Sequence, residues 1–289
     1  MSAAQVKELR ERTGAGIMEC KKALEISQGN LEKAIEELRK LGKTKADKKS
    51  GRIAAEGGIV IETDGKRAVM LEINSETDFV ARDKNFVDFV TFVAQKALQN
   101  YQMDVETLLK QPFDGHHSIE EMRQELVAKV GENVQIRRII YSHQDIPTIG
   151  TYLHGNRIGV IVEMDVDNPD LARDIAMHIA ASRPMVIAPE DIAQEIIDKE
   201  KEIYLAQAAG SGKPQDIIEK MVLGRLKKYL DEVSLLGQPF VKDPDITVGT
   251  LLNKARAKVT AFYRFEVGEG IEKAQEDFKE AVMSQVQSG

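Results

Sequence analysis

The sequence contains a single cysteine, Cys20, so the chain cannot form an internal disulfide framework. A lone thiol is typical of a reducing compartment, and we expect a cytoplasmic protein. No run of about eighteen apolar residues occurs, and no apolar segment preceded by basic residues opens the chain. We therefore expect neither a membrane span nor a secretory signal.

Motifs for catalysis and metal binding are also absent from the sequence. It contains no G-x-x-x-x-G-K-[ST], no G-x-S-x-G, no H-E-x-x-H and no zinc-type Cys/His spacing. Cys20 lies in a segment with helical apolar spacing, which favours a buried thiol over a nucleophile. We predict no catalytic residue, no metal site and no cofactor, so an enzyme is the least favoured class.

Excess positive charge is missing as well, since the formal net charge is −7. Binding of nucleic acid through the whole surface would favour a basic protein. One basic stretch exists, "KLGKTKADKKSGR" at residues 40–52, where six basic residues accompany Asp47. We favour a solvated linker there. The alternative is a docking surface for an acidic partner.

The N-terminal part, residues 4–41, predicts three short helices from its apolar spacing. Gly14, Gly16 and Gly29 mark the breaks, and Asn30 can cap the third helix. The result is a compact helical module, too small for much chemistry of its own.

The middle of the chain predicts a duplicated α+β core with antiparallel sheets. The first copy has a β-hairpin turning at Asp64-Gly65, helices at about 84–100 and 118–130, and a strand in "VQIRRIIYS". The expected buried stripe of the first helix is Phe86, Phe89, Val90, Val93 and Ala97. The second copy has a hairpin at Gly155-Asn156, two helices and the strand "TAFYRFEVG". Because "VGENVQIRRIIY" lines up with "RAKVTAFYRFEV", we infer two halves that each pack helices on one sheet face.

Residues 185–232 interrupt the second copy with two helical patterns joined by "GSG", which predicts an antiparallel helical hairpin. Pro189 and Pro214 fit first helical turns. The expected seam is Ile192, Ile196, Ile203, Ile217, Met221 and Leu226. An amphipathic helix follows near the C-terminus, with Ile271, Ala274, Phe278 and Val282 on one side. The expected parts are 1–52, 53–143, 144–184 with 233–268, 185–232 and 269–289.

Phe79 stands at a corner, in "EINSETDFVARDKNF" at residues 72–86. Its distance from Phe86 allows one continuous helical stripe, and periodicity alone favours a core residue. The polar run Arg82–Asn85 interrupts the stripe and weakens that interpretation, so a ring that waits for a partner remains the alternative. Thr77 can cap the following helix. His178, among alanines, is either a core histidine, which we favour, or a contact across an interface.

Two long segments resemble signatures of the bacterial elongation factor Ts family: "LRERTGAGIMECKKAL" at 9–24 and "EINSETDFVAR" at 72–82. "HIAAS" followed by "RP", "VSLLGQPFV" and "FEVGEGIEK" extend the resemblance over essentially the whole chain. The family implies a ubiquitin-associated-like N-terminal module, a duplicated core, an inserted coiled-coil hairpin and a C-terminal helix. It also implies a guanine nucleotide exchange factor that binds the GTPase elongation factor Tu.

The resemblance assigns the family's functional tetrapeptide to Thr77, Asp78, Phe79 and Val80, which would drive Mg²⁺ from the partner and promote GDP release. Asp78 could cap the following helix, contact the partner, or do both. Further expected partner contacts are Leu9, Arg10, Gly14, Gly16 and His178. We expect no direct nucleic acid or membrane partner, and a homodimer or 2:2 complex through the hairpin. A general adaptor or holdase is the competing class.

Overall fold

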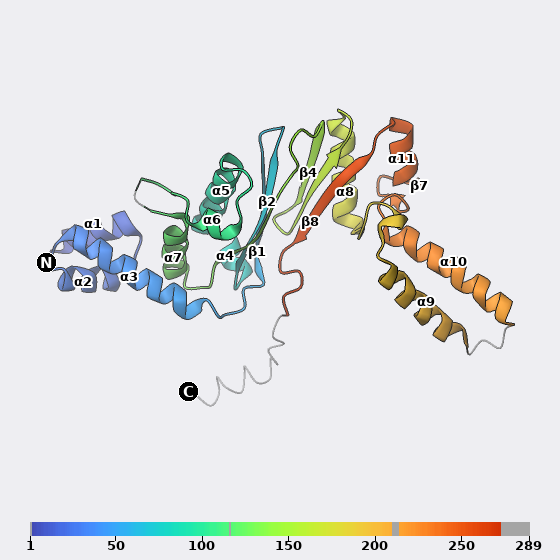
Figure 1. Ribbon diagram of the computed structural model, residues 1–289. Coiled ribbons are helices and arrows are strands. Elements are labelled where there is room, and N and C mark those ends of the chain that lie inside the picture. Colours follow the sequence, from blue (N-terminus) through green and yellow to red (C-terminus); the bar gives the residue numbers. More distant parts are fainter. Residues whose placement is uncertain (1, 116, 210–213, 273–289) are drawn as a thin grey trace. The chain divides into compact units, whose positions relative to one another are not determined.

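The computed structural model describes residues 2–115, 117–209 and 214–272 (Figure 1). The first part of the chain forms α1 (Ala3–Thr13), α2 (Ile17–Ile26), α3 (Leu31–Lys49), β1 (Glu56–Thr63), β2 (Ala68–Ser75), α4 (Asp78–Ala81), α5 (Lys84–Gln99), α6 (Val105–Leu109), α7 (Ile119–Val130) and β3 (Gln135–Tyr141). The second part forms β4 (Thr148–His154), β5 (Ile158–Met164), α8 (Pro169–Ser182), the 3₁₀ turn η1 (Pro189–Asp191), α9 (Gln194–Ala209), α10 (Gln215–Val233), β6 (Pro239–Phe240), β7 (Asp243–Thr247), α11 (Val248–Ala255) and β8 (Val259–Glu266). Two compact units result: residues up to 60, 71–139 and from 266 onward, and residues 61–70 with 140–265.

The three predicted N-terminal helices are present, although α3 continues beyond residue 41 to Lys49. Gly14 ends α1 in the left-handed conformation, and the Asn30 side chain accepts a hydrogen bond of 3.0 Å from the Lys33 N–H at the start of α3. Leu9, Cys20 and other small or apolar side chains form the buried centre. Cys20 is buried, as expected, and this burial raises the pKa of its thiol.

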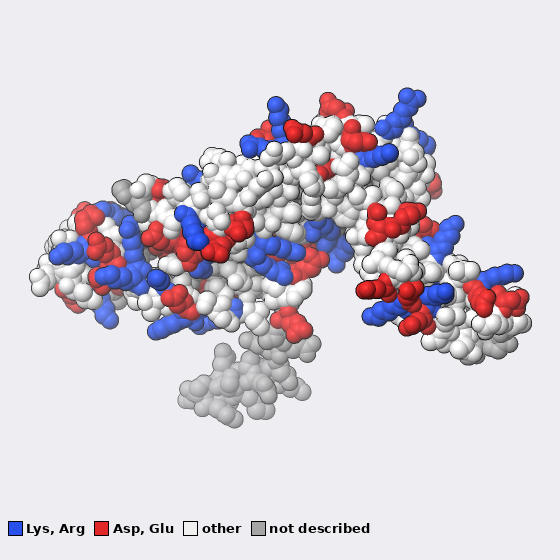
Figure 2. Space-filling view, viewed as in Figure 1, with Lys and Arg blue, Asp and Glu red and all other residues white. Residues whose placement is uncertain are grey.

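The basic stretch after residue 40 is helical, so the linker interpretation is wrong. α3 continues to Lys49, and Gly42 and Ala46 are buried one helical turn apart. A Cβ on Gly42 would lie 3.7 Å from the Gln124 carbonyl oxygen, so α3 lies close against α7. Lys45 forms an ion pair with Glu19. On the face that Figure 2 shows, basic and acidic side chains are interspersed over the N-terminal helices.

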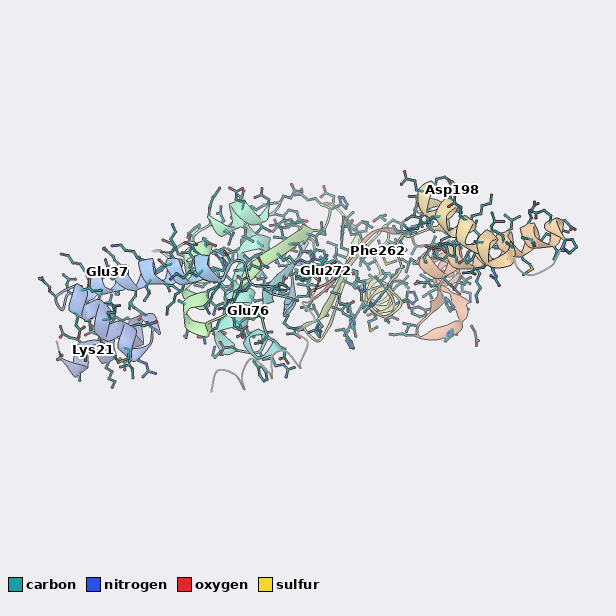
Figure 3. All side chains as sticks on the ribbon, turned by 90° about the horizontal axis from the view of Figure 1, so that it is seen from below. Lys21, Glu37, Glu76, Asp198, Phe262 and Glu272 are labelled. Atoms are coloured by element: carbon teal, nitrogen blue, oxygen red, sulfur yellow. The ribbon has the colours of Figure 1, made fainter. Side chains whose placement is uncertain are left out.

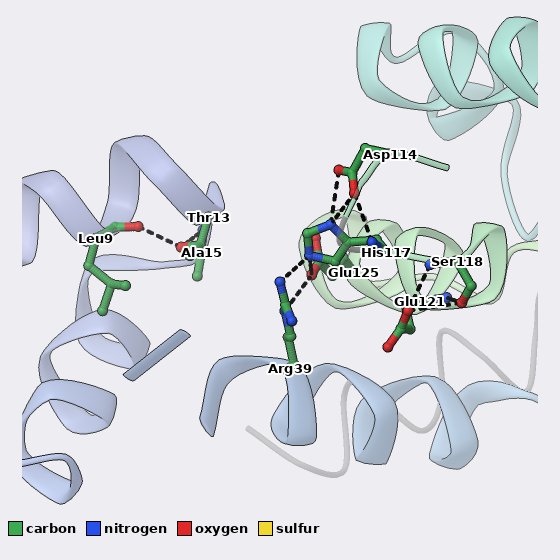
Figure 4. A network of polar contacts seen from close by, with 9 residues as sticks. All are labelled: Leu9, Thr13, Ala15, Arg39, Asp114, His117, Ser118, Glu121 and Glu125. Atoms are coloured by element: carbon green, nitrogen blue, oxygen red, sulfur yellow. Dashed lines mark hydrogen bonds and ion pairs between the residues drawn. The ribbon is translucent and has the colours of Figure 1, made fainter. Parts of the chain in front are cut away.

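A polar network also joins α3 to α7 (Figure 4). Arg39 of α3 contacts the His117 ring, whose Nδ1 lies 2.9 Å from the Asp114 carboxylate. Glu125 of α7 lies 3.7 Å from His117 Nε2, and burial raises the pKa of Glu125. These contacts fix the direction of α7, whose C-terminal end contributes to the site described below.

The first sheet has the strand order β1-β2-β3, and every residue of the central strand β2 is buried. Figure 1 shows α5, α6 and α7 to one side of the β1–β2 hairpin. The predicted stripe of α5 is confirmed, because all five of its members are buried. Two short helices, α4 and α6, were not predicted, since each has too few residues to show a periodic pattern.

Glu72, in the centre of β2, is a fully buried carboxylate. It accepts hydrogen bonds from Arg138 Nε at 2.6 Å, from Arg137 Nη1 at 3.0 Å and from the Gly268 N–H at 2.8 Å. Burial alone would raise the pKa of Glu72, but donation by Gly268, Asn74 and the arginines outweighs burial and lowers it. The segment after β8 is thereby held by a charge inside the fold.

The second sheet repeats this plan, with the order β4-β5-β8 and the second strand again central. β4 and β5 pair antiparallel, with Gly150 opposite Val162. A Cβ on Gly150 would lie 2.5 Å from the Ala172 backbone, so only glycine lets α8 approach this sheet so closely. The α8, α11, β5 and β8 side chains share one hydrophobic core. The predicted α+β duplication is confirmed in element order and strand order.

The inserted segment forms the expected pair of packed helices, α9 and α10. Its seam contains Ala208, Ile218 and Val222, with Tyr204 and Leu205 packed against them. Of the predicted seam residues, Ile192 and Leu226 are buried, at 6% and 8% exposure. Ile203 and Ile217 were assigned wrongly, because they are 39% and 40% exposed, and in α10 the adjacent Ile218 is buried instead, at 8% exposure. Pro189 also differs from expectation, since it begins η1 rather than α9. Residues 210–213, which contain the predicted loop, lie outside the described residues.

The predicted C-terminal helix falls almost wholly on residues 273–289 and lies outside the described residues. Among the helices that the structure describes, none combines the length and the apolar character that crossing a membrane requires.

Candidate functional site

The corner at Thr77–Val80 is a helix of four residues, α4, held between β2 and α5. The Thr77 hydroxyl accepts a hydrogen bond of 3.4 Å from the Val80 N–H, so Thr77 is the N-cap, as predicted. The Arg82 N–H then bonds the Phe79 carbonyl, which ends the turn. An isolated helix of this length is unstable in water, so the surrounding fold must hold it.

Phe79 projects into solvent from this turn and is 82% exposed. The adjacent Val80 and Ala81 are buried at 9% and 4% exposure. The core interpretation from periodicity is therefore wrong, because α4 and α5 are separate helices and do not share one stripe. A large exposed aromatic ring on an otherwise buried turn is a ready contact for another molecule.

Asp78 caps neither neighbouring helix, contrary to one of its expected roles. Its carboxylate pairs with Arg82, 3.0 Å away on the same turn. The cap of α5 is Asp83, which accepts from the Asn85 side chain and the Asn85 N–H, each at 2.8 Å. These two bonds lower the pKa of Asp83 and keep it ionised at neutral pH.

Glu132 is a site residue that the sequence did not single out. Its carboxylate accepts a hydrogen bond of 3.0 Å from the Thr77 N–H and one of 2.7 Å from the Thr77 hydroxyl. The two residues are 55 positions apart, so no local motif connects them. The only available signal was the position of Glu132 directly after the α7 end and before β3.

The N-terminal signature surrounds a cleft of about 980 Å³ between the first three helices and α7. Arg10, Gly14 and Gly16 line it, so three of the expected partner contacts meet in one hollow. The lining also includes Ile17 and Met18, which are 55% and 73% exposed. Leu9 is instead fully buried among the three helices, where it supports the residues that line the cleft.

Lys129 of α7 connects the cleft to the corner. It lines the cleft, and its Nζ donates a hydrogen bond of 2.6 Å to Asn85 Oδ1. Asn85 in turn donates to Asp83, the residue that follows the α4 turn. A short polar chain therefore joins the lining of the cleft to the residues that directly follow the α4 turn.

Comparison with known proteins agrees with the two signatures. The sequence profile described as "Elongation factor TS" matches residues 76–269. The chain is 56% identical to "Elongation factor Ts" of Legionella pneumophila (strain Paris) over 290 residues, covering 100% of this chain and 99% of that protein. It is 58% identical to "Elongation factor Ts" of Thioalkalivibrio sulfidiphilus (strain HL-EbGR7) over 288 residues, covering 99% and 98% of the two chains. The chain belongs to the elongation factor Ts family.

The elongation factor Ts family is one of translation elongation factors, and both of its signatures lie in the first compact unit. The "TDFV" tetrapeptide forms the α4 corner, and "TGAG" forms the connection from α1 to α2. The two signatures thus contain the exposed Phe79 and several residues that line the cleft.

His178, the remaining expected contact, belongs to the second unit and is fully buried. Its Nε2 donates to Gln238 Oε1 at 2.9 Å, and its Nδ1 accepts from the Val241 N–H at 3.2 Å. Burial lowers the pKa of His178, which keeps the ring neutral. This is the core histidine that we favoured, and any effect on a partner would pass through the residues that it supports.

The described residues contain no group of three or more His, Cys, Asp or Glu side chains arranged to hold a metal ion. The corner and the cleft present an exposed ring, apolar side chains and paired charges.

Proposed function

We propose that this protein is a guanine nucleotide exchange factor that binds the GTPase elongation factor Tu, displaces its Mg²⁺ and promotes GDP release. The observation that carries the proposal is the exposure of Phe79, 82%, within the tetrapeptide that the family resemblance assigns to this role. The protein acts by binding, without an acid, base or nucleophile of its own, and it acts in the cytoplasm.

The mechanism rests on the way in which the GTPase holds its nucleotide. Mg²⁺ bridges phosphate oxygens and protein oxygens, so it supplies much of the nucleotide's affinity. Phe79 enters the partner beside that site and shifts the side chains that hold the metal. No reactive group is needed, because the ring acts by occupying space.

Exchange then follows from linkage between two binding events. The factor binds the nucleotide-free GTPase more tightly than the nucleotide-bound form, so nucleotide binds the factor-bound GTPase less tightly by the same factor. Every 1.4 kcal/mol or so of coupling changes affinity about tenfold. Binding energy from other surfaces, including the cleft lined by Arg10, can therefore offset the free-energy cost of inserting Phe79 into the partner.

The experiment measures release of fluorescent GDP from elongation factor Tu after mixing with excess unlabelled GDP. Wild-type protein should accelerate release strongly, and Phe79→Ala should lower the maximal rate at least tenfold. Val87→Ala is a matched control, because Val87 is an apolar residue of α5 that is also exposed, at 46%. The proposal fails if the wild type does not accelerate release, or if Phe79→Ala accelerates it as well as the wild type.

The cleft contribution needs point variants rather than removal of residues 1–52, because α3 buries Gly42 and Ala46. Replacing both Ile17 and Met18 by Ser should raise the factor concentration needed for half-maximal release several-fold. The maximal rate should stay near the wild-type value. An unchanged half-maximal concentration would exclude the cleft as a partner surface.

We also propose that the α9–α10 hairpin mediates a homodimer or a 2:2 complex. Support comes from apolar side chains outside its seam: Ile203, Ile217 and Leu223 are 39%, 40% and 60% exposed. Sedimentation equilibrium of the wild type and of the Ile217→Glu, Leu223→Glu double variant tests this. Assembly should weaken in the variant, and a monomeric wild type that forms only a 1:1 complex would contradict the proposal.

A further inference from the structure

Every backbone and side-chain polar atom of Thr77 takes part in a hydrogen bond. Its N–H and hydroxyl donate to the two carboxylate oxygens of Glu132, at 3.0 and 2.7 Å. Its carbonyl accepts from the Ser75 hydroxyl at 2.9 Å, and its hydroxyl oxygen accepts from the Val80 N–H. Thr77 therefore cannot rotate without breaking several bonds together.

Hydrogen bonds run in both directions between the segment Glu76–Thr77 and the segment Glu132–Asn133. Glu76, which directly follows β2 and is labelled in Figure 3, accepts the Asn133 N–H at 2.6 Å. Asn133 is 2% exposed, and its side chain donates to the carbonyls of Arg52 and Ser50 at 2.9 and 3.3 Å. Glu76, Thr77, Glu132 and Asn133 together form what we call the corner clamp.

The loop that supplies Glu132 is itself fixed. Gly131 ends α7 in the left-handed conformation at φ 79°, which few residues other than glycine adopt readily. Its carbonyl accepts from Lys49 of α3, and the Val134 carbonyl accepts from Arg123 of α7 at 2.7 Å. Both sides of Glu132 are thus tied to helices, and the carboxylate is presented from a rigid support.

We propose that Glu132 is a positioning residue for nucleotide exchange, which holds the α4 turn in the geometry that presents Phe79 to the GTPase. The inference rests on the proposed exchange function. A four-residue helix does not hold its shape alone, so without Glu132 the turn samples other conformations and Phe79 must be ordered during binding. Ordering a side chain and its backbone on binding lowers the energy available for displacement of the nucleotide.

Loss of a residue that only stabilises the fold would weaken the whole unit, whereas loss of Glu132 should affect mainly the α4 turn. The bonds from the Glu132 carboxylate go to Thr77, two residues before Phe79, and Thr77 also caps α4. A hydroxyl that donates to a carboxylate is polarised toward accepting the Val80 N–H. Loss of the clamp should therefore loosen the turn locally while the buried strand β2 keeps its structure.

The test uses Glu132→Gln, which keeps the volume and replaces one accepting oxygen by an amide donor. Thr77→Val keeps the shape and removes the hydroxyl, whereas Thr77→Ser keeps the hydroxyl. Glu106→Gln is the matched control, because the Glu106 side chain is 80% exposed and pairs only with Lys110 among the contacts described. Labelled-GDP release from elongation factor Tu is measured over a range of factor concentrations.

We expect Glu132→Gln and Thr77→Val each to lower the maximal release rate at saturating factor about tenfold. The double variant should be no slower than the worse single variant, because both changes disrupt the interaction between the Thr77 hydroxyl and the Glu132 carboxylate. Glu106→Gln should keep the wild-type rate, and Thr77→Ser should be faster than Thr77→Val because it keeps the hydroxyl that Glu132 accepts. In hydrogen exchange, the Phe79–Arg82 amides of Glu132→Gln should exchange faster while the Leu71 and Ile73 amides stay protected.

A wild-type maximal rate in Glu132→Gln, or additive losses in the double variant, would overturn the positioning role. If Phe79→Ala slows exchange and Glu132→Gln does not, only the positioning role fails and the exchange function stands. If the wild type does not accelerate release, both fail. Equal loss of protection in the corner and in β2 would assign Glu132 a general structural role instead.

Discussion

Phe79 and Val80 are consecutive residues of one helical turn, yet Phe79 is 82% exposed and Val80 is 9% exposed. Successive helical side chains point about 100° apart, so a short turn lying on a fold can bury one and present the next. An exposed ring gains little from folding, because apolar burial is the main favourable term. Of these two adjacent side chains, Val80 therefore contributes to the stability of the fold, whereas Phe79 is left free for the partner contact that we propose.

The difference in burial predicts that truncation of these two side chains to alanine has very different effects on the free energy of unfolding. Phe79→Ala should change the free energy of unfolding by no more than about 0.5 kcal/mol, because the ring makes little buried contact. Val80→Ala should lower it by roughly 1.5–2.5 kcal/mol through lost burial and a residual cavity. Urea unfolding followed by circular dichroism measures both. Similar losses in the two variants would contradict the assignment.

Gly42 offers a test of the contact between α3 and α7. A Cβ at this position would be 3.7 Å from the Gln124 carbonyl oxygen and 3.8 Å from the Ala128 Cβ, which is ordinary contact. Gly42→Ala should therefore raise the free energy of unfolding by roughly 0.5–1 kcal/mol, since glycine weakens a helix interior. Gly224→Ala, in open space on α10, is the matched control and should give a similar gain.

A longer side chain at the same glycine should have the reverse effect. Gly42→Leu would push into the α7 backbone and lower the unfolding temperature, whereas Gly224→Leu would not. Thermal unfolding of the four variants distinguishes a close helix contact from a solvated segment. Equal tolerance of leucine at both positions would show that α3 does not lie against α7.

Glu72 should make stability depend on acidic pH. Its pKa is lower in the fold than its ordinary value of 4.5, so the unfolded chain binds the proton more readily. The stabilisation is complete well above pH 4.5 and is lost as the pH falls through the folded pKa. Glu72→Gln, which leaves Arg137 and Arg138 without their shared carboxylate, should cost roughly 3 kcal/mol at pH 7.

The difference between wild type and Glu72→Gln should therefore shrink as the pH is lowered from about 6 to about 3. Urea unfolding at several pH values gives this difference directly. Other carboxylates titrate in both proteins and cancel in the comparison. A difference that stays constant over the range would show that Glu72 is not ionised in the fold at neutral pH.

His178 should also make the folded state more stable at neutral pH than at acidic pH, over a higher pH range than Glu72. Burial lowers its pKa below the ordinary value of 6.5, so the unfolded chain gains a proton that the folded ring does not accept. Stability from this group is complete above about pH 6.5 and falls as the pH drops below it. His178→Leu should be less stable than wild type at pH 8, because Gln238 Oε1 loses its donor.

The difference in stability between wild type and His178→Leu should narrow between pH 7 and pH 5, and the contribution of Glu72 cancels because both proteins contain it. Thermal unfolding at fixed ionic strength measures it. A difference in stability that increases as the pH falls would indicate that the His178 ring is protonated and paired with an acidic group. Exchange activity of this variant, at a temperature where it is folded, separates a supporting role from a direct contact.

Much of the fold could be predicted from local pattern. The α5 stripe from Phe86 to Ala97 was correct because a long amphipathic helix repeats its signal. The turns near Gly65 and Gly155 were correct because both residues adopt positive φ, at 86° and 59°. Helix α3 was cut short because its lysines suggested solvent, while the small residues Gly42 and Ala46 that bury it carry little hydrophobic signal.

Where the local pattern was ambiguous, tertiary packing determined which side chain is buried. Ile217 and Ile218 are adjacent and chemically identical, so periodicity alone could not choose the seam residue. Phe79 was assigned to a surface only through the family resemblance, since helical spacing pointed to the core. Glu132 could not be found at all, because a side-chain contact between distant loops leaves no periodic trace.

The corner clamp also sets an order of events during synthesis of the chain. Thr77 leaves the ribosome 55 residues ahead of Glu132, an interval of roughly 3–11 s at about 5–20 residues per second. A nascent chain ending before residue 132 carries the tetrapeptide without the carboxylate that shapes it. For the exchange function that we propose, unfinished chains would therefore bind the partner poorly until Glu132 has been added and the α4 turn is held in place.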